Sequence, residues 1–318
     1  MAAEVSKIVG CELPDRPVTW LKRDLILYAL GIGAKNDNED LSYLYELDPN
    51  FAAFPTYPVV LPFKGDSQEL NLFAETMKTD VPGLPPADLS KSVHGSQSIE
   101  ILKPLPSASG PGWKWKTKYT GLSENKSGVV LTTENQLVDP QGVLYAKLYA
   151  STFYIGMKIT GDKFAKVIAG PPQAKPIPDG KAHWVVRQNT AIEQALIYRL
   201  SGDYNPLHID PQVGLAGGFG GTILHGLATF GFAARALLDA IAYNEPETLK
   251  FISARFTSPV KPGDVLETHA WEVGPGPAGS PEDTIEVSFV TKNLTSGKDA
   301  LGGGIAYIIK APVILASL

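Results

Sequence analysis

The pattern of apolar and polar residues along the chain occurs twice. Apolar residues recur at helical spacing in residues 21–30 and again in residues 192–200. In each half, strand-like runs follow, at residues 113–119, 128–137 and 143–155 in the first and at residues 265–273, 284–293 and 304–309 in the second. Each half is therefore expected to be a helix with an antiparallel sheet, which gives an α+β fold.

Short motifs align the two halves with each other. One match puts Gly33 at the position of Asp203, and another puts His94 at the position of His225. The first half has therefore lost an acidic residue that the second half keeps.

A segment rich in proline and glycine, AGPPQAKPIPDGK at residues 169–181, suits an extended connection between the halves. We therefore expect an N-terminal half at residues 1–165, a linker at residues 166–183 and a C-terminal half at residues 184–318.

The spacing within the two halves differs in an informative way. From His94 to Pro104 is 10 positions, whereas from His225 to Pro259 is 34, so the second half has 24 residues that the first half lacks. These include residues 227–244, which are apolar almost all round and of helical length, as in a buried central helix. The volume that the first half leaves vacant could receive an apolar ligand tail.

The first half has a longer segment before His94, which includes Pro82-Gly83-Leu84-Pro85-Pro86. We expect this segment to be a loop or lid.

Composition and charge exclude several classes of protein. The chain of 318 residues is 44% hydrophobic and 19% charged, as in an ordinary globular protein, and its net charge of −5 gives no reason to expect nucleic acid as a partner. One cysteine, Cys11, allows no intramolecular disulfide. Residues 1–30 do not resemble a secretory signal, and no apolar run approaches the roughly 20 residues of a membrane helix. The tripeptide Ala316-Ser317-Leu318 resembles a peroxisomal address but lacks the basic middle residue of that signal.

The densest chemistry lies in residues 198–226, YRLSGDYNPLHIDPQVGLAGGFGGTILHG. The helix that ends before Gly202 has Asn189 or Thr190 as its expected N-cap. Pro206 is expected to prevent the helix from resuming, so that the polar residues of the kernel, Asp203, Asn205 and His208, project from an ordered loop.

Each of these residues also has a purely structural interpretation. Asp203 could cap its own loop, Asn205-Pro206 could form a simple turn, and His208 could be a core histidine bonded to the backbone. We expect His225 to be structural, and the histidines and acids form no recognisable metal-ligand pattern. We recognise no G-x-G-x-x-G motif in the strand–turn–helix context that dinucleotide binding requires, and we expect no redox cofactor.

The run from Tyr198 to Pro211, followed by Leu224-His225-Gly226, resembles the hydratase motif of the (R)-specific 2-enoyl-CoA hydratases. Together with its degenerate first half, the chain resembles the hydratase 2 unit of peroxisomal multifunctional enzyme type 2, within the MaoC-like dehydratases. The resemblance implies a double hot-dog fold in which the N-terminal half lacks the long central helix and holds the acyl chain. It also implies a homodimer, an acyl-CoA substrate and a catalytic C-terminal half. The expected location is peroxisomal, with the cytoplasm as the alternative.

The resemblance further implies that Asp203 and His208 are the catalytic pair, that Asn205 positions water or substrate, and that the backbone N–H of Gly226 contributes to an oxyanion site. Hydration of a double bond conjugated to a thioester requires an acid, a base and donors to the enolate oxygen, and this set supplies them. We therefore expect hydration of trans-2-enoyl-CoA to (R)-3-hydroxyacyl-CoA in β-oxidation. The alternatives are dehydration of an (R)-3-hydroxyacyl thioester in a biosynthetic pathway and a non-catalytic acyl-CoA binding module.

Overall fold

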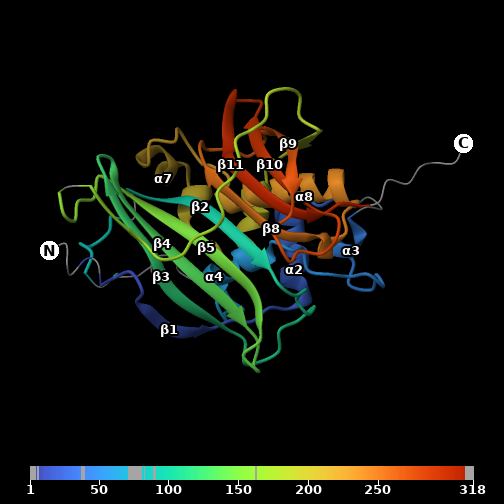
Figure 1. Ribbon diagram of the computed structural model, residues 1–318, viewed down its shortest axis with the longest axis horizontal. Coiled ribbons are helices and arrows are strands. Elements are labelled where there is room, and N and C mark those ends of the chain that lie inside the picture. The colour runs from blue at the N-terminus through green and yellow to red at the C-terminus, as the bar shows by residue number, and fades with distance from the viewer. Residues whose placement is uncertain are drawn as a thin grey trace, which may run out of the picture.

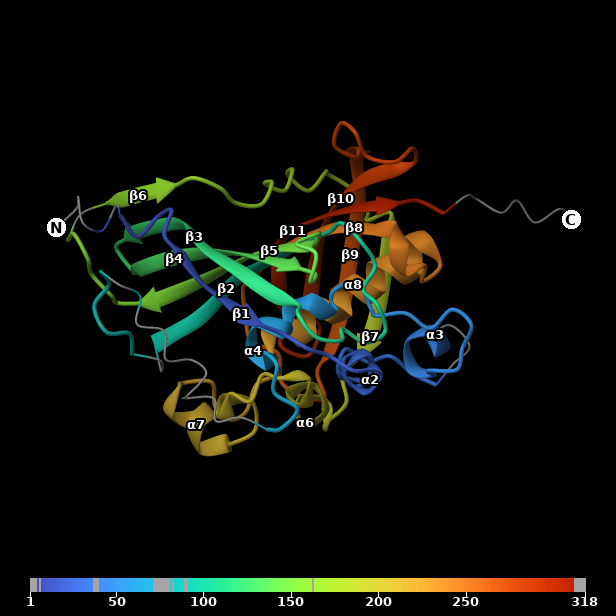
Figure 2. The same cartoon turned by 90° about the horizontal axis from the view of Figure 1, so that it is seen from below.

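The protein is built on one long, curved antiparallel sheet with helices against its inner face (Figures 1 and 2). The computed structural model describes residues 5, 7–36, 40–70, 81, 83–88, 91–161 and 163–311. In this part of the chain the sheet has 11 strands in the order β1-β3-β4-β5-β2-β8-β11-β10-β9-β7, with β6 paired to β3. The strands are β1 Glu12–Pro17, β2 Ser92–Ile101, β3 Lys114–Asn125, β4 Gly128–Val138, β5 Leu144–Ile155, β6 Phe164–Val167, β7 Trp184–Asn189, β8 Leu249–Phe256, β9 Val265–Pro275, β10 Thr284–Asn293 and β11 Lys298–Ile309.

Short helices connect the strands, and one long helix fills the second half. The α-helices are α2 Lys22–Gly31, α3 Leu41–Leu44, α4 Leu61–Lys64, α6 Gln194–Tyr198, α7 Pro211–Ala216 and α8 Gly226–Ala242. Single 3₁₀ turns are η1 Tyr57–Val59, η3 Arg199–Ser201, η4 Pro206–His208 and η5 Pro246–Thr248. None of the helices in the described part is long and apolar enough to cross a membrane.

The two expected sheets are joined edge to edge by β2 and β8. These strands pair antiparallel from Ser96 opposite Arg255 to Glu100 opposite Phe251, so the halves form one continuous sheet. The expected α+β architecture is confirmed. The domain boundaries stay predictions, although residues 168–183 form no helix or strand between β6 and β7.

The long helix of the second half is confirmed as α8, and it lies against β8, β9 and β11 (Figure 1). Phe230, Phe232 and Leu238 are fully buried in the main apolar cluster, because nearly every face of this helix meets the sheet or another helix. The helix ends where Tyr243 adopts a left-handed conformation with φ of 48°.

The first half has no long helix among its described residues, and part of the space is taken by residues 41–64. Tyr57, Val60 and Leu61 are fully buried beside Trp20, whose ring packs edge-on against Trp113 at a centroid distance of 4.8 Å. Short helical turns therefore replace some of the volume of the missing helix.

Three glycines bring α2, α6 and α8 close together. A Cβ at Gly31 would lie 3.0 Å from Cα of Tyr198, and one at Gly231 would lie 2.3 Å from Cγ2 of Ile32. A Cβ at Gly33 would lie 2.4 Å from the ring of Phe232, so this position has no room for the acid found at its counterpart. The loss of the acid in the first half therefore has a steric reason.

The structure corrects two expectations at the start and end of the second-half helix. The N-cap of α6 is Glu193, whereas Asn189 ends β7 and the Thr190 hydroxyl donates to the carbonyl of Asp264. The helical structure ends at Ser201, as expected, but Pro206 begins a new turn, η4, so His208 lies at the end of that turn and not in a loop.

Two further expectations fall partly outside the described residues. Pro82 and the whole tripeptide Ala316-Ser317-Leu318 lie there. Residues 83–88 form no helix or strand, and Leu84 packs against a second apolar cluster that includes Leu122 and Val129.

Candidate active site

The loop that carries the candidate residues runs between η3 and η4, directly against the first half of the protein. It starts at Gly202, which has a φ of +130°. A Cβ at Gly202 would lie 2.6 Å from Cβ and 2.8 Å from Cα of Lys64 at the end of α4. Only glycine combines this backbone angle with so close an approach, so the first half fixes where the loop begins.

Lys64 is itself held in place. Its ammonium group donates to the carbonyls of Thr19 at 2.8 Å and Ser67 at 2.9 Å, and it lies 3.6 Å from Oδ2 of Asp24. Both ionised side chains are buried, and a buried charge is stable only when it is paired and hydrogen-bonded. The loop therefore rests on a rigid support.

The structure brings Asp203, His208 and His225 into one buried group. One potential ligand atom of each lies within 4.8 Å of those of the other two. Asp203 and His208 each retain 8% exposure, so both are nearly shielded from solvent. Nδ1 of His208 lies 2.9 Å from the carbonyl oxygen of Ile223. Because a carbonyl only accepts, Nδ1 carries the proton and Nε2 of the neutral ring keeps a lone pair.

The surroundings shift the proton affinities of the pair in opposite directions. Burial raises the pKa of Asp203 above its usual value, and the nearby His208 offsets part of that rise. Burial lowers the pKa of His208, against the opposing effect of Asp203. Burial therefore favours the neutral form of both groups, and perturbed proton affinities of this kind are common at catalytic sites.

Asn205 is fixed by the turn that it begins. Its Oδ1 accepts from the backbone N–H of Leu207 at 3.0 Å, and its own N–H donates to Oδ1 of Asp203 at 3.3 Å. The side-chain oxygen thus caps η4 and fixes the orientation of the amide group.

Gly226 begins α8 immediately after His225 and is partly exposed. The first N–H groups of a helix have no partner within the helix and lie at the positive end of its dipole. A Cβ at Gly226 would lie 3.0 Å from the ring of Phe256, so a side chain there would press on that ring. The helix start can therefore donate to an oxygen that develops negative charge.

Two aromatic residues near the site were not among the site residues expected from the sequence. The rings of His94 on β2 and Phe256 on β8 pack edge to face at a centroid distance of 4.9 Å, next to Gly226. Alignment of the two halves matches His94 with His225, but His94 lies in strand β2 whereas His225 precedes helix α8. His94 reaches Phe256 because β2 pairs with β8. No local sequence motif predicts that pairing.

The group of Asp203, His208 and His225 does not have the geometry of a metal centre. The two imidazole rings are stacked at a centroid distance of 3.7 Å with an interplanar angle of 27°. The lone pair of each imidazole nitrogen lies in the plane of its ring, and the planes of two stacked rings are nearly parallel. Two nitrogens that bind one zinc ion must instead direct their lone pairs at the same point, about 2.0–2.1 Å from each nitrogen. The arrangement instead suits proton transfer.

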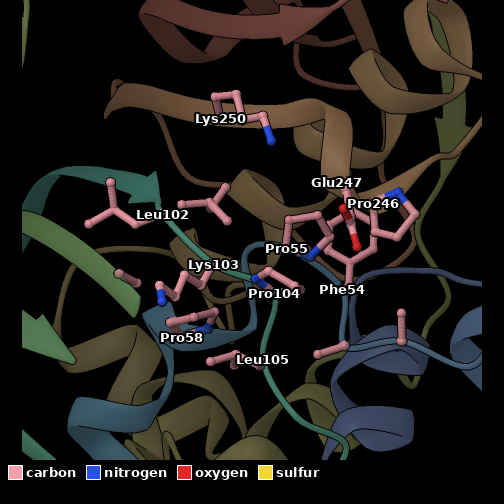
Figure 3. Close-up of a pocket in the computed structure, with 14 residues that line it drawn as sticks. Phe54, Pro55, Pro58, Leu102, Lys103, Pro104, Leu105, Pro246, Glu247 and Lys250 are labelled. Carbon is pink, nitrogen blue, oxygen red and sulfur yellow. The ribbon is translucent and has the colours of Figure 1, made fainter. Parts of the chain in front are cut away.

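A well-formed pocket of the described structure lies elsewhere (Figure 3). It has an open volume of about 640 Å³ and is lined by the chain around Phe54 and Pro58, the segment after β2, the turn η5 and Lys250 of β8. Ile101 of this pocket and His94 near the site are seven residues apart on β2, which corresponds to roughly 20 Å along a strand. The pocket is therefore separate from the candidate active site.

Comparison with known proteins places both halves in described families. Residues 19–156 match the MFE-2 hydratase 2 N-terminal domain, and residues 174–295 match the MaoC like domain. A probable dehydratase of Ajellomyces capsulatus is 40% identical over 80% of this chain and 69% of its own length. A probable enoyl-CoA hydratase 2 of Dictyostelium discoideum is 31% identical over 97% of both chains. Peroxisomal multifunctional enzyme type 2 of Drosophila melanogaster is 37% identical over 90% of this chain, which spans 45% of that longer protein.

Solved structures agree with the sequence matches. The MaoC-like dehydratase of Phytophthora capsici superposes with a TM-score of 0.85 at 35% identity, over 96% of this chain and 98% of that one. A Mycobacterium tuberculosis protein with a double hotdog fold has a TM-score of 0.56 at 11% identity, over 95% of this chain and 96% of that one. The expected double hot-dog fold is therefore confirmed.

Proposed function

The chain belongs to the MaoC-like dehydratase family, with the hydratase 2 N-terminal domain as its first half, and on this premise we propose that it hydrates trans-2-enoyl-CoA to (R)-3-hydroxyacyl-CoA. An enzyme with this activity is a hydro-lyase. The observation that carries the proposal is the burial of Asp203 and His208 in one group with His225, the residue before the partly exposed start of α8 at Gly226.

The proposed mechanism divides the work among four groups. One member of the pair Asp203 and His208 takes a proton from water while the water oxygen adds to C3 of the enoyl group. The other member delivers a proton to C2 of the same group. The amide nitrogen of Asn205 orients the water. The N–H of Gly226 donates to the thioester oxygen as the enolate forms, and such a donor is typically worth about 2.7–4 kcal/mol in the transition state. Water and the thioester supply every atom of the product, so the reaction as proposed needs no cofactor.

The first half is proposed to bind the acyl chain, and its strand β2 brings His94 against Phe256 beside Gly226. We further propose a role in peroxisomal β-oxidation, because several relatives are named as peroxisomal enzymes. The family resemblance leads us also to propose a homodimer. A fluorescent fusion with and without residues 316–318 tests the location. Peroxisomal signal that persists without these residues would contradict a role for the tripeptide.

The decisive experiment is an assay of the purified chain with trans-2-decenoyl-CoA. Loss of absorbance from the conjugated thioester should accompany formation of the 3-hydroxy product, and chiral analysis should find the (R) alcohol. Formation of the (S) alcohol, or of no product, would reject the proposed function.

A further inference from the structure

His225 contacts both members of the proposed catalytic pair, although it has no role in the proposed chemistry. It is the last residue before α8 and is only 1% exposed. Its Nε2 lies 3.1 Å from the backbone carbonyl oxygen of Asp203. Because the carbonyl accepts, Nε2 carries the ring proton and fixes the backbone from which the Asp203 carboxylate projects.

The ring of His225 contacts two other rings. Its centroid is 3.7 Å from that of His208, on which it is stacked, and 4.8 Å from that of Tyr198, to which it is tilted by 48°. The stacked ring covers one face of His208, so water cannot approach that face. The orientation of His208 therefore depends on two contacts, the Ile223 carbonyl at Nδ1 and the His225 ring.

The position requires His225 to be neutral. Its Nδ1 is buried and has no hydrogen-bond partner among the described residues, so a proton on that nitrogen would be unsatisfied. Burial, His208 and Arg199 all lower the pKa of His225, and the Asp203 carbonyl opposes them only in part. The remaining titratable group in contact with it, Tyr198, has a pKa raised well above its usual value by burial and carries no charge.

We propose that His225 is a positioning residue that sets the geometry of both Asp203 and His208, through one hydrogen bond and one stacking contact. The proposal rests on the proposed function, and it assigns separate consequences to the two contacts. The hydrogen bond holds Asp203 at the distance needed for proton transfer. The neutral stacked ring keeps His208 dehydrated on one face and free of a neighbouring positive charge.

Two substitutions separate the contacts. His225→Phe keeps a flat ring under His208 but removes the donor to Asp203, whereas His225→Gln offers an amide donor and removes the ring. For His225→Phe we expect kcat to fall about 100-fold, as for a misplacement of about 1 Å, with KM little changed. The limb of the pH profile that reports His208 should stay where it is in the wild type.

His225→Gln is expected to move that limb. Water that reaches the uncovered face of His208 relieves the burial that lowers its pKa, so the pKa should rise towards the ordinary value of about 6.5. The limb of kcat/KM that reports His208 should then shift to higher pH, whichever role His208 has in the pair. His183→Gln, an exposed histidine at the start of β7, is the matched control and should change neither rate nor profile.

The outcomes distinguish this proposal from the proposed function. If the wild type hydrates the enoyl-CoA and both His225 variants keep its kcat and its pH profile, the positioning role is rejected while the function stands. If the wild type itself has no activity, the function is rejected. Imidazole NMR of the wild type gives a test that needs no variant. The Nε2-protonated neutral form of His225 should persist across the acid limb, and titration of His225 within that limb would overturn the proposal.

Discussion

At the scale of the residue, the site depends on Asp203 and His208, whose burial disfavours the charged form of each side chain. Burial favours the neutral forms of both Asp203 and His208, while their mutual attraction favours the charged forms. A proton can then pass between them and the substrate at little cost. The pairing follows from a tight loop, in which Asp203 and His208 are separated by a single 3₁₀ turn.

Removing either proton carrier should therefore abolish hydration. For Asp203→Asn and His208→Gln we expect kcat to fall by about 10²–10⁴-fold, the usual contribution of general acid–base catalysis, with little change in acyl-CoA affinity. Asp210→Asn is a matched control, because Asp210 caps α7 through Oδ1 and lies in the same segment. Stopped-flow assays with calorimetric binding separate the two effects, and near wild-type turnover in both variants would exclude the pair as catalytic.

At the scale of the element, the segment that follows α2 packs so closely against α8 that an acid has no room at Gly33. Gly33 has a φ of +84°, and a Cβ there would collide with Phe232 on α8. Gly142, in the turn before β5, has nearly the same φ of +83° with open space around it. The two positions differ chiefly in packing.

Gly33→Ala should accordingly destabilise the protein more than Gly142→Ala. Both substitutions carry the backbone penalty of a left-handed residue, but only the first adds overpacking, which typically costs about 1–3 kcal/mol. Chemical denaturation of the two variants measures the difference in free energy of unfolding. Equal losses would show that Phe232 moves aside without cost.

The sequence predicts elements better than it predicts their contacts. The period of the apolar residues locates α2, α8 and most strands, and the difference in spacing identifies the missing helix of the first half. The kernel motif identifies Asp203 and His208, since their chemistry is local in the chain. It does not reveal the support of Gly202 by Lys64 or the position of His94, because both arise from contacts between halves that are distant in sequence.

At the scale of the whole molecule, the two halves share one apolar core and one sheet. The main cluster contains Trp20 and Tyr57 from the first half with Phe230 and Phe289 from the second. Contacts between α2 and α6 and the pairing of β2 with β8 extend this common interior. Neither half can open without exposing the core of the other.

The intact chain should therefore unfold as one unit. We expect a single calorimetric transition, with the calorimetric enthalpy equal to the van't Hoff enthalpy. The intrinsic fluorescence of the tryptophans on both sides of the seam should change over the same temperature range. Two resolved transitions would show that the halves are energetically independent.

The seam between β2 and β8 has a consequence for how such an enzyme can change over evolutionary time. In an assembly of identical subunits, every inherited substitution appears on both sides of the interface, so an acid cannot be discarded from one side and kept on the other. Fusion of two copies into one polypeptide removes that constraint. Gly33 and Asp203 occupy matching positions, but only the second copy keeps the acid. Likewise, only the second copy has the long central helix α8.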